Sequence, residues 1–167
     1  MTPANFTPNE IATAYHEAGH AVMALVLGRN VQRVSVQDNQ LRLGHCEIKK
    51  GRFRPIKDGL ETEILILLGG LAAETRQMGN YDSAGAAQDL RGVRSLTQLR
   101  AAGRRQVERL ERRMLDKAEY ILDQPGVWLA AQRIADELLR HTTLSGRAAR
   151  HLFDQAAAQA KAEGNGH

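Results

Sequence analysis

The sequence predicts a mainly α-helical (α+β) domain that contains a small β-hairpin. Three observations lead to this prediction. Apolar residues recur at helical spacing over most of the chain, one short region alternates and is rich in β-branched residues, and no long linker divides the chain. A chain of 167 residues can bury a sizeable core. We therefore expect one domain over residues 1–167, with residues 1–6 and 163–167 as frayed tails.

The first helix has the clearest boundaries. Thr7 and Glu10 are spaced as a capping box, and Pro8 lies at the first helical position, where its missing N–H costs nothing. Apolar residues then recur at helical spacing as far as Leu25, and Gly28 is typical of the residue that follows a helix. A helix is therefore expected from residue 8 to the residues just before Gly28.

The β-hairpin is expected in the region that follows. Residues 31–36 alternate and are rich in β-branched side chains, Asp38 and Asn39 form a turn signal, and residues 41–48 are a second extended segment. Residues 51–59 are polar and contain a proline, which favours a loop.

Helices are predicted over most of the remaining chain. Residues 60–75 are apolar and long enough for a buried helix, in which Gly69 and Gly70 indicate close packing against another backbone. Residues 77–84 are expected to form a loop. The further predicted helices are one that begins near 83–87, a continuous helical pattern over 89–122 with Val107, Leu110, Met114, Ala118 and Ile121 on one face, and helices over 127–140 and 145–162.

The composition excludes several classes of protein. With 43% hydrophobic and 25% charged residues the chain is neither disordered nor collagen-like, and its single cysteine, Cys46, excludes an intramolecular disulfide. Residues 1–9 lack the features of a signal peptide, and the longest apolar stretches fall short of the roughly 20 residues that cross a bilayer. We therefore expect a cytoplasmic protein without a membrane segment.

One motif carries recognisable chemistry. His16 and His20 are four residues apart within the first predicted helix, so their side chains lie on one face and can bind one zinc ion. Glu17 lies beside that face, where a carboxylate can act as the general base of a metalloprotease. The alternative is a surface helix with two solvated histidines, but the apolar neighbours of the motif favour burial.

A catalytic zinc ion needs a third protein ligand, which spacing alone does not choose. Position 26 is a valine, so a third histidine ten residues after His16 is excluded. His141 ends a predicted helix, where it is expected to interact with the helix dipole. Asp82 has a second interpretation as a helix cap, and Glu74 as a solvated helix end. The candidates by chemistry are Glu47, Glu61, Glu63, Glu74, Asp82, Asp89, His45 and Cys46.

Three sequence blocks occur in a characteristic order. They are Y-H-E-A-G-H-A at 15–21, L-G-G-L-A-A-E at 68–74 and G-A-A-Q-D-L at 85–90. Together they resemble the peptidase domain of the FtsH family (peptidase family M41). The resemblance implies a helical zinc-peptidase domain with one zinc ion per chain, held by His16, His20 and Asp89, and with Glu17 as the catalytic base. It also implies that an extended substrate pairs with an edge strand at residues 41–46, including Leu41, Leu43, Gly44 and His45.

The chain departs from the family pattern in three ways. Leu71 replaces the arginine common in the second block, the segment after the third block is shortened, and no G-x-x-x-x-G-K-S/T motif for ATP occurs. The sequence therefore predicts a zinc-dependent endopeptidase for flexible or unfolded polypeptides that does not itself use ATP. Its expected partners are a polypeptide substrate and, for folded substrates, a separate unfoldase or a homo-oligomer. The alternative is a non-proteolytic, zinc-binding adaptor or regulatory relative.

A cluster of arginines lies between residues 91 and 113. It contains Arg91, Arg94, Arg100, Arg104, Arg105, Arg109, Arg112 and Arg113, opposed by Glu108 and Glu111. The overall charge is only +4, and no nucleic-acid-binding motif accompanies the cluster, so no nucleic-acid partner is expected. A solvated helix face is the favoured interpretation, followed by a protein-docking surface.

Overall fold

The computed structural model describes residues 5–37, 45–48 and 59–166. Within these residues it confirms a mainly α-helical protein with a small antiparallel sheet. The elements are α1 (Pro8–Val26), β1 (Val31–Ser35), β2 (His45–Ile48), α2 (Gly59–Met78), α3 (Ser83–Thr97), α4 (Arg104–Leu122), α5 (Pro125–His141), β3 (Thr143–Ser145) and α6 (Gly146–Gly164). The described helices include none long and apolar enough to cross a membrane.

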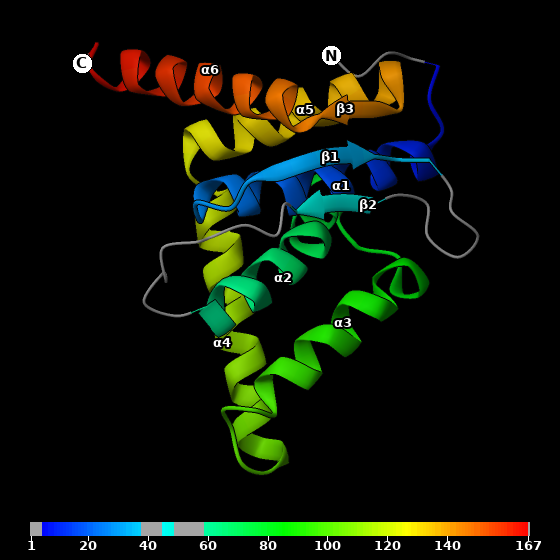
Figure 1. The fold of residues 1–167 in the computed structure, drawn as a ribbon, viewed down its shortest axis with the longest axis vertical. Helices are drawn as coiled ribbons and strands as arrows, with labels where there is room; N and C mark the ends of the chain where they lie inside the picture. Colours follow the sequence, from blue (N-terminus) through cyan, green and yellow to red (C-terminus); the bar gives the residue numbers. More distant parts are fainter. Residues whose placement is uncertain (1–4, 38–44, 49–58, 167) are drawn as a thin grey trace.

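Helix α1 is the centre of the molecule. All residues from Ala14 to Leu25 are buried, because α2, α5 and the sheet surround the helix. Figure 1 shows α5 and α6 on one side of α1 and α2, α3 and α4 on the other. The predicted capping box is confirmed, since the Thr7 hydroxyl accepts from the Glu10 N–H and the Glu10 carboxylate accepts from the Thr7 N–H. The start of α1 is therefore determined locally, whereas its position depends on its neighbours.

Helices α1 and α2 cross at a pair of glycines. A Cβ atom on Gly19 would lie 2.2 Å from the Gly69 carbonyl oxygen, and one on Gly69 would lie 2.8 Å from the Gly19 carbonyl oxygen. Any side chain at either position would push the two backbones apart, so the expected close packing at Gly69 is confirmed. This close approach brings the residues of α2 within hydrogen-bonding distance of the histidines on α1.

The sheet has the order β2-β1-β3, with all neighbouring strands antiparallel. Its β1–β2 pair, with Ser35 opposite His45, confirms the expected pairing of the two extended segments. The predicted turn at Asp38 and Asn39 and residues 41–44 lie outside the described residues. The sequence did not predict β3, which pairs Leu144 with Val34 after a left-handed residue, Thr142 (φ 63°). Three residues between two helices are too short for a periodicity signal.

The prediction of a continuous helical pattern over 89–122 is wrong, because α3 ends at Thr97 and α4 begins at Arg104. Gly103 has a positive φ of 79°, a conformation that favours glycine and lets the chain reverse. A continuous helix over 83–122 would be about 60 Å long and would extend far beyond the rest of the protein. The reversal instead packs α4 against α2, with its predicted apolar face largely buried.

Several helix ends also differ from the expectations. Helix α2 continues to Met78, α5 begins at Pro125 itself, and α6 continues to Gly164. Of the residues expected in the two tails, 163 and 164 belong to α6, and Phe6 packs against the core. The N–H of the first residue in a helix has no acceptor within that helix, so proline loses no hydrogen bond there. This explains why α5 can begin at Pro125.

Candidate metal centre

Helix α1 presents three buried polar side chains at one place. His16 is 7%, Glu17 3% and His20 6% exposed, and their potential ligand atoms all lie within 4.8 Å of one another. The two histidines share a face because they are four residues apart on a helix. Buried polar groups need partners, so the apolar context excludes two solvated histidines.

Asp89 of α3 completes a triangle with the two histidines. Its Oδ2 atom lies 3.0 Å from His16 Nε2 and 3.1 Å from His20 Nε2, and the two Nε2 atoms are 3.1 Å apart. Asp89 is 3% exposed. Helix α3 begins at Ser83, with Asp82 as its N-cap, so Asp89 lies in the second turn of the helix. The fold thus brings together the three residues that the sequence resemblance joined across 73 positions.

The outer nitrogens of the imidazoles determine which atoms face the triangle. His16 Nδ1 donates to the Glu74 Oε2 atom at 2.9 Å, and His20 Nδ1 donates to the Ile66 carbonyl oxygen at 2.8 Å. The Nε2 atom of each ring therefore faces Asp89. Two imidazole nitrogens and one carboxylate oxygen thus converge on one point, where either a proton or a metal ion reduces the repulsion between their lone pairs.

The size and chemistry of the triangle fit zinc. Two imidazole nitrogens and one carboxylate oxygen are a typical donor set for a catalytic zinc ion. Bond lengths of 2.0–2.1 Å in a tetrahedral arrangement separate the ligand atoms by about 3.3 Å. The three separations of 3.0–3.1 Å are slightly shorter, so a small outward movement of the side chains accommodates the ion.

Gly70 of α2 keeps the space beside the imidazoles open. A Cβ atom at this position would lie 2.6 Å from His20 Nε2 and 2.8 Å from His16 Nε2. These distances are shorter than van der Waals contacts, so no other residue fits without displacing the rings. The sequence predicted a close backbone approach at this glycine but not the identity of its neighbours.

Glu74 is the residue whose place in the site the sequence missed. It is 5% exposed, so its interpretation as a solvated helix end is wrong. Its Oε1 atom accepts from the Asp82 backbone N–H at 2.9 Å while Oε2 accepts from His16. A signal was present in the sequence, because Ile66, Gly70 and Glu74 are spaced four apart and so share one face of α2. Ile66 and Glu74 accept hydrogen bonds from His20 and His16, and Gly70 lies against both imidazole rings.

The other ligand candidates lie away from the triangle or outside the described residues. Asp82 caps α3 through a bond from the Ala84 N–H, as its alternative interpretation predicted. Glu61 pairs with Lys117, Glu63 pairs with Arg29, and the exposed His141 lies at the end of α5, 3.4 Å from Glu137. The side chains of His45, Cys46 and Glu47 in β2 are outside the described part of the structure.

The pKa of His16 is raised from its ordinary value of 6.5 to about 9. Burial by itself lowers this pKa, but hydrogen bonds to Asp89 and Glu74 outweigh the desolvation, and the charges of Glu17 and Asp89 add to them. Below about pH 9 the metal-free protein therefore holds a proton on His16, and this proton lies where a metal ion would bind.

The zinc affinity of the metal-free protein is expected to rise with pH up to about 9. Zinc binds neutral imidazole, so below that pH each ion must displace the His16 proton, whereas above it the proton is already lost. Release of one proton corresponds to up to about tenfold in affinity per pH unit. Competition with a chelator of known pH dependence between pH 6.5 and 9 measures this slope. A flat profile would contradict the assignment of a proton to His16.

Glu74→Gln is expected to weaken zinc binding by about 10–100-fold without unfolding the protein. An amide can accept from His16 Nδ1, but its NH2 group then faces the Asp82 N–H, so one of the two hydrogen bonds is lost. Isothermal titration with zinc measures the effect. Glu119→Gln is the matched control because Glu119 is exposed on α4. Unchanged affinity in the Glu74 variant would show that Glu74 does not orient His16.

Comparison with known proteins identifies the family of the chain. The model of peptidase family M41 matches residues 7–102, which include His16, Glu17, His20, Glu74 and Asp89. The chain belongs to peptidase family M41. The resemblance drawn from the three sequence blocks is thereby confirmed. Peptidase family M41 is a family of metallopeptidases, and the relatives described below are named as zinc metalloproteases.

The relatives of this M41 chain include several proteins named ATP-dependent zinc metalloprotease FtsH. That of Protochlamydia amoebophila is 37% identical over 82 residues, which cover 47% of this chain and 9% of the relative. That of Marinobacter nauticus is 33% identical over 98 residues, 56% of this chain and 15% of the relative. FtsH 2 of Thermoanaerobacter sp. is 37% identical over 81 residues, which cover 47% of this chain and 16% of the relative. The chain thus spans 9–16% of the length of these relatives.

Proposed function

We propose that this chain is a zinc-dependent endopeptidase that cleaves flexible or unfolded polypeptides. The observation that carries the proposal is the convergence of His16 Nε2, His20 Nε2 and Asp89 Oδ2 beside the buried carboxyl group of Glu17. A site that only binds zinc has no need of a buried glutamate next to the two histidines. This carboxylate therefore favours an enzyme over an adaptor.

His16, His20 and Asp89 would hold the metal ion, with Glu74 and the Ile66 carbonyl keeping the two rings in place. When bound, zinc supplies the Lewis acidity that makes water nucleophilic near neutral pH and polarises the carbonyl of a peptide bond. Glu17 takes the proton from the attacking water onto its carboxylate and gives it to the amine that leaves. Glu17 is 3% exposed, so its carboxylate is shielded from bulk water.

Strand β2 offers a place for the substrate. It is an edge strand of the β2-β1-β3 sheet, and it contacts α1, which bears His16 and Glu17. In the proposal an extended polypeptide adds to the outer edge of β2 through backbone hydrogen bonds. Of the expected substrate residues, His45 lies in β2, whereas Leu41, Leu43 and Gly44 are outside the described residues.

The proposal extends to ATP and to partners. The sequence contains no G-x-x-x-x-G-K-S/T motif, so this chain by itself is expected to cleave unfolded polypeptides at the same rate with and without ATP. A folded substrate would require unfolding by another protein. Rates on casein and on a stably folded protein, each with and without ATP, test this part of the proposal.

The deciding experiment is cleavage of a fluorescently labelled, unfolded casein by the purified protein. We expect about one zinc ion per chain, cleavage at internal peptide bonds, loss of activity with a chelator and recovery on return of zinc. Mass spectrometry of the products locates the bonds. A protein that binds one zinc ion and cleaves no unfolded substrate would contradict the proposal and favour a non-proteolytic zinc-binding adaptor.

A further inference from the structure

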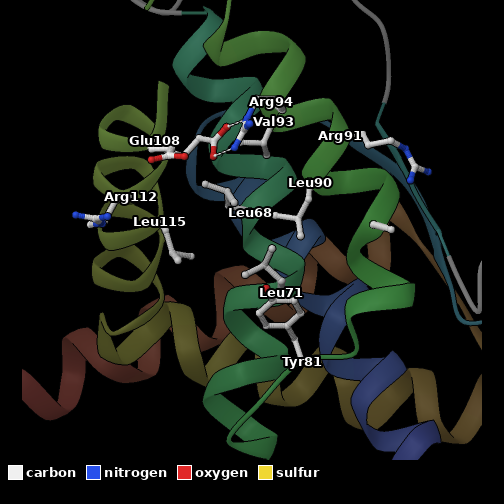
Figure 2. A pocket seen from close by; sticks show the side chains of 12 residues that line it. Leu68, Leu71, Tyr81, Leu90, Arg91, Val93, Arg94, Glu108, Arg112 and Leu115 are labelled. Atoms are coloured by element: carbon white, nitrogen blue, oxygen red, sulfur yellow. Dashed lines mark hydrogen bonds and ion pairs between the residues drawn. The ribbon is translucent and has the colours of Figure 1, made fainter. Parts of the chain in front are cut away.

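A groove lies between α3 and α4, and none of its lining residues belongs to the metal centre. It has a volume of about 620 Å³, whereas the two other described pockets hold about 220–230 Å³. Its apolar residues come from three helices: Leu68 and Leu71 from α2, Leu90 and Val93 from α3, and Leu115 from α4. Figure 2 shows these side chains between the two helices, with Tyr81 at one end. We call this site the α3–α4 groove.

The charges around the α3–α4 groove leave an excess of unpaired arginine. Its two carboxylates already have partners, since Glu111 binds Arg94 and Glu108 binds Arg104. Arg91 on the α3 side and Arg112 on the α4 side are exposed, and neither takes part in an ion pair within the described residues. In Figure 2 they lie on opposite sides of the groove, with their side chains directed outward from α3 and α4 rather than across the apolar floor. An occupant therefore meets an apolar floor between two cations.

The walls of the groove determine the backbone conformation of its occupant. Both walls and the floor are helices, whose interior N–H and C=O groups are already bonded to one another. An extended peptide would find no strand edge to pair with, so its own backbone groups would be buried without partners. A helix satisfies these groups internally and presents apolar side chains at intervals of three and four residues.

We propose that the α3–α4 groove binds an amphipathic, acidic helix of a partner polypeptide. Leucine-like residues of that helix fill the apolar floor, and aspartates or glutamates on its flanks pair with Arg91 and Arg112. Arg105, Arg109 and Arg113 are also exposed on α4, and their positive charge steers an acidic partner toward this helix.

The part of the chain that the structure describes does not provide such a helix. The large hydrophobic side chains exposed in the described residues are Tyr81, Leu99 and Tyr120, and they do not form an apolar stripe flanked by acids. Residues 49–58 carry five basic residues and one acid in the sequence, the opposite of what the groove requires. A second copy or a segment of this chain is therefore a poor match, and a different acidic protein is the better one.

The test is selection from a phage-displayed library of random peptides about 16 residues long, enough for four helical turns. The bait is the full chain with Glu17→Gln, so that cleavage does not remove bound peptides. We expect enriched peptides to carry net negative charge and apolar residues at i, i+3 or i+4, and i+7, and to become helical on binding. Enrichment of basic peptides, of peptides without this spacing, or of none at all would overturn the proposal.

Variants then locate the binding site of an enriched, fluorescently labelled peptide by anisotropy. Arg91→Glu combined with Arg112→Glu is expected to weaken binding at least about tenfold, and Leu115→Asn by a similar factor. Arg147→Glu on α6 is the matched control, because Arg147 is also exposed and lies outside the groove. Equal binding by all variants, or a dimer in sedimentation experiments that Leu115→Asn dissociates, would overturn the proposal.

This result does not depend on the proposed peptidase activity. Peptide binding is measured with a variant that lacks the proposed general base, and the groove residues do not contact the triangle of His16, His20 and Asp89 in any described hydrogen bond. If the protein binds acidic helices but has no proteolytic activity, the groove proposal is supported and the peptidase proposal is not. If the protein cleaves unfolded polypeptides but binds no acidic helix, the peptidase proposal is supported and the groove proposal is not.

Discussion

Glu17→Gln is expected to reduce cleavage of unfolded casein by about a hundredfold to ten-thousandfold while the protein still binds one zinc ion. Glutamine has nearly the same shape as glutamate, so the buried site remains packed, but an amide cannot take a proton from water. Metal content and cleavage rate are measured on the same preparation. The combination of full zinc and lost activity assigns Glu17 to proton transfer.

Two further variants test whether that loss is specific to the Glu17 carboxylate. Glu17→Asp keeps the carboxylate but shortens its side chain, so we expect partial activity, between those of the glutamine variant and the original protein. Glu10→Gln changes a glutamate of the same helix that lies in the capping box, outside the metal centre, and it should retain activity. If Glu17→Gln cleaves casein at the original rate, Glu17 is not the base and the proposed mechanism is wrong.

Gly70→Ala is expected to lower zinc affinity by at least about a hundredfold. Helix propensity alone would favour alanine by roughly 0.5–1 kcal/mol, so it predicts a more stable protein. The structure predicts the opposite, because the new Cβ atom would lie 2.6 Å from His20 Nε2 and 2.8 Å from His16 Nε2. The rings must move, and the triangle with Asp89 is then lost.

Gly59→Ala provides the matched control. Gly59 begins the same helix, and a Cβ atom there would meet no atom within 4 Å, so zinc affinity should be unchanged. Calorimetric titration with zinc, together with circular dichroism of the metal-free variants, separates metal loss from unfolding. Asp89→Ala should also lose zinc, since it removes the proposed third ligand, which lies beside both rings. Tight binding of one zinc ion by the Gly70 variant would contradict the arrangement.

Much of the fold is encoded in short stretches of sequence. The capping box at Thr7 and Glu10 depends on residues three positions apart, and the shared face of His16 and His20 depends on a spacing of four. Both could be predicted because a helix places nearby residues in a fixed geometry. The apolar face of α4 and the pairing of β1 with a second strand were predictable for the same reason.

Other features depend on packing between distant segments. The chain reverses between Thr97 and Arg104, although the sequence pattern is helical on both sides of this segment. The reversal is stabilised by the packing of α4 against α2, which lies far away in the sequence. Strand β3 has three residues, and its pairing with β1 joins positions more than a hundred residues apart. No local pattern contains this information, since the partner that stabilises each segment is supplied by another part of the chain.

The metal centre shows the same division. The sequence by itself determined that His16 and His20 share a helix face with Glu17 beside them, and family resemblance added Asp89. Only the tertiary structure placed Asp89 beside both rings, placed Glu74 behind His16, and brought Gly70 against both rings. The physical reason is the glycine crossing of α1 and α2 together with the start of α3 at Asp82. These determine which distant groups come within about 3 Å of the histidines, and that distance is a property of packing rather than of spacing along the chain.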